Sequence, residues 1–90
     1  MTAEKLLQII DQYETLLGEY PAKQLERYDA HPTSDVEFLS HCRWMLGSMR
    51  ERVQTGHIKK AMRWLGFIQG AMAAIRFRTI EQLKNDSRPT

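Results

Sequence analysis

The first apolar positions of the chain follow a helical repeat. They are separated by alternating steps of four and three residues and fall on Leu6, Ile10, Tyr13, Leu17 and Tyr20. Such spacing places side chains on one face of a helix. Thr2 can cap the start of this helix, and Pro21 disfavours helical backbone at the residue before it. The pattern therefore predicts an amphipathic helix over residues 3–19.

Two further apolar stripes follow, one on either side of a glycine. The first is made of Leu39, Cys42, Leu46, Met49 and Val53, and the second of Ile58, Ala61, Leu65, Ile68, Met72 and Ile75. Ser34 and Glu37 have the spacing of a capping box, and Gly56 can end a helix. We expect helices over residues 35–54 and 58–76, paired as an antiparallel αα-hairpin.

The C-terminal residues carry a weaker helix signal. Thr79 and Gln82 form a second capping box. We expect a break before this box, a short helix over residues 80–84 and a polar tail over residues 85–90. The alternative is a third helix that continues through Lys84, because no Gly or Pro interrupts it.

Composition fits one small soluble domain. The chain has 90 residues, of which 42% are apolar and 27% charged, and no segment alternates with the period of a strand. The predicted fold is all-α, a single helical domain over residues 1–90. It is a small helical bundle built on the antiparallel αα-hairpin, with an N-terminal amphipathic helix.

Other features bear on the compartment. The longest run without a charged residue, around residues 65–75, is far shorter than the roughly 20 residues that a membrane helix needs. Acidic residues among the first apolar positions are atypical of a secretory signal. Cys42 is the only cysteine, so no internal disulfide can form, which suits a reducing compartment. We expect a cytoplasmic protein without a membrane partner.

Residue types that often carry catalysis are scattered. His31, His41 and His57 have unrelated spacings, and no metal-binding pattern such as H-E-x-x-H occurs. Cys42 falls on an apolar stripe, where a cysteine is more often a small hydrophobe than a nucleophile. We expect no enzymatic activity, no metal and no cofactor.

The charges are divided between the two halves of the chain. Residues 1–40 carry eight acidic and three basic side chains, and residues 41–90 carry ten basic and three acidic ones. The acidic first helix can pair with the basic hairpin within one molecule. Alternatively, the basic half receives an anionic partner.

Trp44 lies roughly opposite the apolar stripe of its helix. Tryptophan is enriched at interface hot spots, so we expect a partner-binding surface on Trp44, Arg43, Ser48 and Arg52. The alternative is that the first helix covers this face and Trp44 belongs to the core.

The third helix is apolar almost all round. Two glycines inside a helix cost about 1 kcal/mol each relative to alanine, and close approach of another helix can offset that cost. We expect self-association, most simply a two-fold dimer, through Trp64, Gly66, Phe67, Gly70 and Ala74. The alternative is that the first helix and the C-terminal segment cover this helix.

A cationic cluster straddles the joint at Gly56. Its members are Arg50, His57, Lys59, Lys60 and Arg63. Together with the open amides of a helix start they could hold a small anionic nucleotide or a nucleic acid. The alternative is a set of solvated charges, since no Gly-rich phosphate loop or recognition helix accompanies them.

Three strings give the chain a family resemblance. They are Cys42-Arg43-Trp44-Met45, the run from Lys60 to Gly70 that contains R-W-L-G-F-I-Q-G, and Thr79-Ile80-Glu81-Gln82-Leu83. Over roughly residues 31–84 the chain resembles small proteins encoded by tailed bacteriophages. The resemblance implies an accessory protein of the host cytoplasm that binds a host protein and inhibits it, which is the leading expectation for function.

Overall fold

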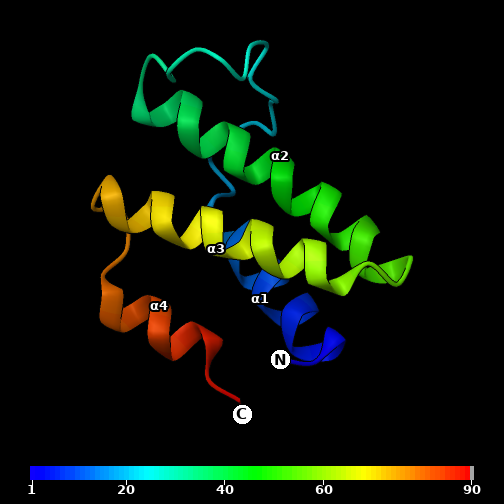
Figure 1. The fold of residues 1–90 in the computed structure, drawn as a ribbon. Coiled ribbons are helices and arrows are strands. Elements are labelled where there is room, and N and C mark those ends of the chain that lie inside the picture. The colour runs from blue at the N-terminus through cyan, green and yellow to red at the C-terminus, as the bar shows by residue number, and fades with distance from the viewer. Residues whose placement is uncertain (90) are drawn as a thin grey trace.

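Four helices make up the ordered framework of the protein. The structure, a computed structural model, describes residues 1–89. Within these residues there is no strand, and the helices are α1 (Ala3–Leu16), α2 (Asp35–Gln54), α3 (Ile58–Ala74) and α4 (Ile80–Ser87) (Figure 1). The prediction of an all-α fold is confirmed for this part of the chain. Thr90, the last residue of the predicted tail, lies outside the described residues.

Three helices begin at the predicted capping residues. Thr2, Ser34 and Thr79 each accept a hydrogen bond from the backbone amide three residues later, at 3.0–3.1 Å. The capping box at Thr79 is complete. The one at Ser34 is half formed, because the Glu37 carboxylate accepts from the Thr33 hydroxyl instead of turning back to the Ser34 amide.

The first helix is shorter than predicted. It ends at Leu16 rather than at residue 19. Arg43 of α2 donates hydrogen bonds to the carbonyls of Gly18, at 3.0 Å, and Tyr20, at 2.5 Å. The turn after α1 is thus fixed by a residue of another helix, a constraint that the sequence of α1 does not contain.

The third helix also ends early, at Ala74 instead of residue 76. Arg76 adopts left-handed backbone, with φ of 62°. The amides of Arg76 and Phe77 bond back to the carbonyls of Ala73 and Met72, at 3.1 and 2.8 Å. This is the Schellman arrangement that closes a helix, and it excludes the alternative of one helix through residue 84.

The last helix is longer than predicted. Residues 85–87, assigned to the polar tail, are helical, and Leu83 and Asp86 of α4 are buried. Asp86 forms an ion pair with Arg78, at 2.6 Å. The tail prediction was wrong here because a buried partner for an acidic residue cannot be recognised from local polarity.

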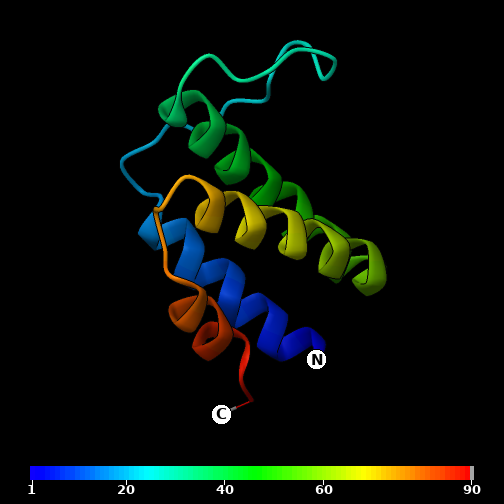
Figure 2. The same cartoon turned by 60° about the vertical axis from the view of Figure 1, so that its left-hand side comes forward.

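The helices are arranged around α2 and α3. Both α1 and α3 pack against α2, and the chain reverses direction between α2 and α3 at Gly56 (Figures 1 and 2). Helix α4 lies beside α1, to which Asp86 is hydrogen-bonded (Figure 2). The helix-free residues 17–34 run past the N-terminal end of α2. They form the third wall of the site described below.

The predicted stripes form the core. All their members are buried except Tyr20, Ile58 and Ile75, which are partly buried and pack against the others. None of the described helices is both long and apolar enough to span a membrane.

Candidate functional site

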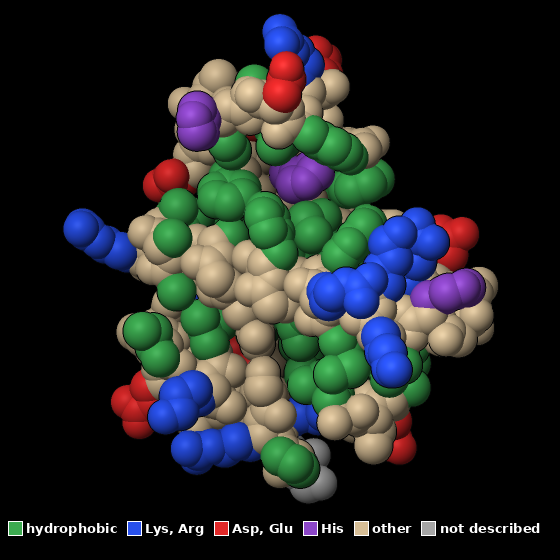
Figure 3. All heavy atoms as spheres, viewed as in Figure 1, with side chains coloured by type: hydrophobic (Ala, Val, Ile, Leu, Met, Phe, Trp, Pro, Cys, Tyr) green, Lys and Arg blue, Asp and Glu red, His purple; other side chains and the backbone are tan. Residues whose placement is uncertain are grey.

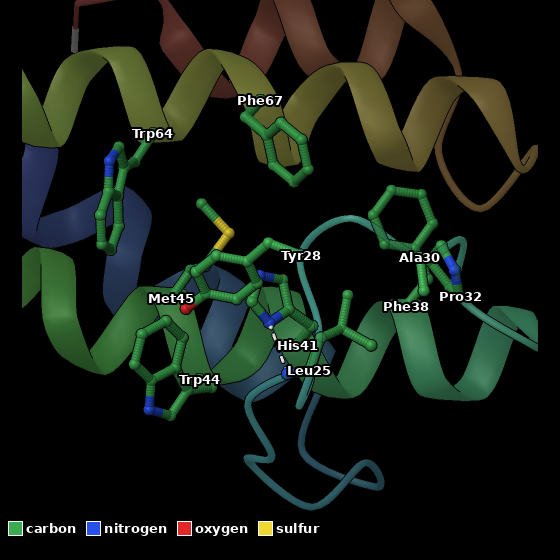
Figure 4. Close-up of a pocket in the computed structure, with 10 residues that line it drawn as sticks. All are labelled: Leu25, Tyr28, Ala30, Pro32, Phe38, His41, Trp44, Met45, Trp64 and Phe67. Atoms are coloured by element: carbon green, nitrogen blue, oxygen red, sulfur yellow. Dashed lines mark hydrogen bonds between the residues drawn. The ribbon is translucent and has the colours of Figure 1, made fainter.

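An apolar groove lies where α2, α3 and the segment 17–34 meet. Its volume is about 430 Å³. The lining residues, which define the aromatic groove, are Leu25, Tyr28, Ala30, Pro32, Phe38, His41, Trp44, Met45, Trp64 and Phe67 (Figure 4). Hydrophobic side chains gather on this face, with Lys and Arg side chains at its right-hand end in Figure 3. A concave surface of this composition is typical of a binding site.

Helical spacing brings the aromatic rings together. On α2, Phe38, His41 and Trp44 recur every three residues, and on α3 Trp64 and Phe67 do the same. The ring centroids of Trp44 and Trp64 are 6.3 Å apart, and those of Phe38 and Phe67 are 6.0 Å apart. Each such pair contributes about 0.5–1.5 kcal/mol beyond the area it buries. The walls of the groove are therefore held by contacts between the two helices.

The groove is open to solvent. Phe67 is 50% exposed and Tyr28 68% exposed, whereas Trp44 and Trp64 are partly buried. Large apolar side chains exposed together at one place are less common on a monomer than scattered ones. The exposed rings thus make the groove a candidate binding surface.

His41 joins the third wall to α2. Its ring is buried and stacks on Trp44, with centroids 5.5 Å apart. Its Nδ1 accepts a hydrogen bond from the backbone amide of Leu25 at 3.1 Å, so the neutral ring carries its hydrogen on Nε2. Burial lowers the pKa of His41 below its usual value. The neighbouring amide of Lys23 bonds to the Ser40 carbonyl at 3.2 Å and supports the same attachment.

The predicted partner surface is divided by the structure. Trp44 lies in the groove, contacts Trp64 of α3 and, partly buried, packs against the core. Arg43 turns instead to the end of α1, as described above. Ser48 and Arg52 are partly buried and lie four and eight residues beyond Trp44, so they continue its face of α2.

The predicted self-association surface is divided as well. Trp64 and Phe67 line the groove together with Trp44, although the sequence assigned them to different surfaces. Gly66, Gly70 and Ala74 are exposed. A Cβ atom added at either glycine would meet nothing within 4 Å. Gly66, Gly70 and Ala74 form a small-residue ladder on α3. Within residues 1–89 no helix lies against its two glycines, and packing of the ladder against a second copy stays a prediction.

The cationic cluster is only partly assembled. Arg50 pairs with Asp11, at 2.5 Å, and with Glu14, both on α1. This is an instance of the expected pairing between the acidic first helix and the basic hairpin. Lys60 Nζ lies 5.8 Å from the Trp64 ring centroid, at the edge of the groove. The remaining members, His57, Lys59 and Arg63, are exposed, and His57 Nδ1 contacts the Thr55 hydroxyl at 3.0 Å.

A buried polar cluster was not predicted from the sequence. The Asp86 carboxylate accepts hydrogen bonds from Arg78, at 2.6 and 2.7 Å, and from the Tyr13 hydroxyl at 2.7 Å. Gln69 donates to the same hydroxyl at 3.1 Å. Tyr13, in the middle of a core stripe, was the available signal, because a buried tyrosine hydroxyl usually has a partner. The cluster attaches α4 to α1 and α3.

Ionisation in this cluster follows from its contacts. The hydrogen bond from Arg78 lowers the pKa of Asp86, and burial raises the pKa of Tyr13 to about 12. Both groups therefore keep their roles of acceptor and donor at neutral pH. The cluster is a structural device rather than a reactive one.

The single cysteine, Cys42, is buried in the core. Burial raises the pKa of the Cys42 thiol to about 11, which leaves it protonated at neutral pH. No group of three or more His, Cys, Asp or Glu side chains within residues 1–89 is arranged to hold a metal ion. The side chains that line the aromatic groove offer apolar contact and hydrogen bonding.

Comparison with protein-family models, curated proteins and solved structures finds no match for this chain.

Proposed function

We propose that this chain is a non-catalytic binding protein whose aromatic groove receives an apolar segment of another protein. The observation that carries this proposal is the convergence of Trp44, Trp64 and Phe67, partly exposed, on one concave surface. Tryptophan anchors in partly desolvated pockets supply much of the free energy in many interfaces.

In this proposal α2 and α3 form an antiparallel αα-hairpin that supports the groove. Two helices in contact along their length present side chains at fixed positions, so the groove is preorganised. The loss of side-chain freedom on binding is then small. This supports recognition of a protein segment by shape.

The partner in this proposal is a host protein, and the consequence of binding is inhibition. This part rests on the resemblance of R-W-L-G-F-I-Q-G and its companion strings to phage proteins. In this proposal the groove covers an apolar segment of the host protein. The host protein can then no longer use that segment for its own contacts.

Site-specific photo-crosslinking tests the proposal. A benzophenone amino acid replaces Phe67 in the groove or, as matched control, Ile80, which is 70% exposed on α4. Irradiation in a lysate of the cells that produce the protein should give a crosslinked protein from position 67 and not from position 80. Equal crosslinking at both positions, or none from position 67, contradicts the proposal.

A second candidate is binding of a nucleotide or nucleic acid. It is favoured by Lys60, which places a cation beside an aromatic ring on which a base could stack. Affinity for an oligonucleotide should then fall steeply with salt, because phosphate contacts release counterions. A protein segment held by apolar contacts should bind with weak salt dependence.

A further inference from the structure

The hydrogen-bonding groups at the rim of the aromatic groove are mostly donors. An indole nitrogen can only donate, and neither Trp44 nor Trp64 makes a side-chain hydrogen bond within residues 1–89. The Nδ1 atom of His41 is already used by Leu25, which leaves only an N–H on that ring. An occupant that reaches these N–H groups can pair with them through acceptors.

Charge differs between the two ends of the groove. Trp44 and Trp64 lie at one end and Phe38 and Pro32 at the other (Figure 4). Lys60 Nζ lies at the tryptophan end, 5.8 Å from the Trp64 ring centroid.

Two further cations lie near the two tryptophans along their helices. Arg52 lies two turns beyond Trp44 on α2, and Arg63 precedes Trp64 on α3. Lys60, Arg52 and Arg63 form no ion pair within residues 1–89. Their charge is available to a ligand.

The opposite end is acidic. Asp35 and Glu37 occupy the first turn of α2, next to Phe38. A carboxylate in a ligand would be repelled there and attracted at the tryptophan end. Like charges placed together across an interface disfavour binding, so this difference sets an orientation.

We infer that the groove selects an acidic apolar segment of a partner protein, with Leu or aromatic anchors between its walls and Asp or Glu against Lys60 at the tryptophan end. This inference rests on the proposed function and specifies its partner. Charge complementarity distinguishes this occupant from a basic or neutral segment.

Selection from a random library tests the inference. The full-length protein is immobilised, and a displayed library of random 12-residue peptides is selected on it. The enriched peptides should combine Leu, Phe or Trp with an excess of Asp and Glu over Lys and Arg. Affinities of the synthesised peptides are then measured by fluorescence anisotropy with four variants, each first checked for its helical circular dichroism.

The variants come as two matched pairs. Phe67→Ala should weaken binding about 30-fold, as expected for a hot-spot ring, and Ile80→Ala should leave it unchanged. Lys60→Glu should weaken binding at least about fivefold, whereas Lys84→Glu, the same charge change on α4, should have no such effect.

The outcomes separate the inference from the proposed function. Peptides that depend on Phe67 but are neutral or basic, or that bind Lys60→Glu as well as the wild type, overturn the inference and leave the proposed function standing. Absence of any peptide that depends on Phe67 overturns both. Competition for the same site by a 12-residue oligothymidine, abolished by Lys60→Glu, would assign the groove to nucleic acid and also overturn both.

Discussion

Through the protonation of His41, the stability of the aromatic groove should depend on pH. The neutral ring accepts a hydrogen bond from the backbone amide of Leu25, and burial lowers the pKa of His41. A histidine whose pKa is lower in the folded state contributes stability that is present above its ordinary value of 6.5 and is lost as the pH falls through the lower folded value. Acidification below about pH 6.5 should therefore loosen the third wall of the groove.

The first prediction concerns this residue. The free energy of unfolding should fall between pH 7.5 and pH 5.5, and His41→Gln, which keeps an acceptor but does not titrate, should remove much of this fall. Urea titrations at both pH values measure it. His31→Gln, at an exposed position, is the control and should retain the wild-type dependence. An unchanged dependence in His41→Gln would show that this ring does not govern the acid response.

Asp86 provides the second prediction. Asp86→Asn should lower the free energy of unfolding at pH 7 by about 2 kcal/mol, because a charged partner of Arg78 is lost. The hydrogen bond from Arg78 lowers the pKa of Asp86, so its contribution is present above 3.8 and disappears as the pH falls through the lower folded value. The difference between wild type and variant should accordingly vanish in strong acid. Glu81→Gln, on the exposed first turn of α4, should cost little; an equal loss in both variants contradicts the assigned role.

At the scale of the element, helix starts were more predictable than helix ends. A cap such as Ser34 is local, because its oxygen bonds an amide three residues away. The ends of α1 and α3 depend on Arg43 from another helix and on left-handed backbone at Arg76, a residue that rarely adopts it. Asp86 was missed for a related reason, since the residues that bury it come from α1 and the loop before α4.

Arg76 gives the third prediction. Its left-handed backbone, φ of 62°, is strained for a residue with a Cβ atom but not for glycine. Arg76→Gly should raise the free energy of unfolding by about 0.5–1 kcal/mol. Arg88→Gly is the control. Because φ at Arg88 is −68°, the change relieves no strain, and the added freedom of the unfolded chain should leave this variant no more stable than the wild type. Thermal or urea unfolding in which the first variant is no more stable than wild type would contradict the Schellman assignment.

At the scale of the whole molecule, the stripes predicted the core and the tryptophans predicted a surface. The sequence could not show that Trp44 and Trp64 share one groove, because that depends on the rotation of α2 and α3 about their axes. The sequence also could not place residues 21–33. These residues are attached to α2 through isolated contacts, such as the hydrogen bond from the Leu25 amide to His41. Of the ten lining residues, only Trp44, Trp64 and Phe67 were among the predicted surface residues, and their meeting in one groove was not predicted.

Self-association gives the fourth prediction. The Gly70 position is open within the chain, so Gly70→Leu should leave the fold of the monomer intact and weaken a dimer that uses the small-residue ladder. Sedimentation equilibrium at micromolar concentration should show a dimer for the wild type and a lower average mass for the variant. Lys84→Leu adds similar bulk on α4 and should keep the wild-type mass. A wild-type mass of 10.6 kDa at every concentration would contradict self-association.

The most direct test of the binding groove follows its two indole groups. The chain has two tryptophans, so the ¹H–¹⁵N spectrum contains two indole signals, which Trp44→Phe assigns. On titration with a selected acidic apolar peptide, both signals should shift and saturate together, because Trp44 and Trp64 lie at the same end of one groove. If neither indole signal moves at saturation, the peptide binds elsewhere and the groove is not the binding site.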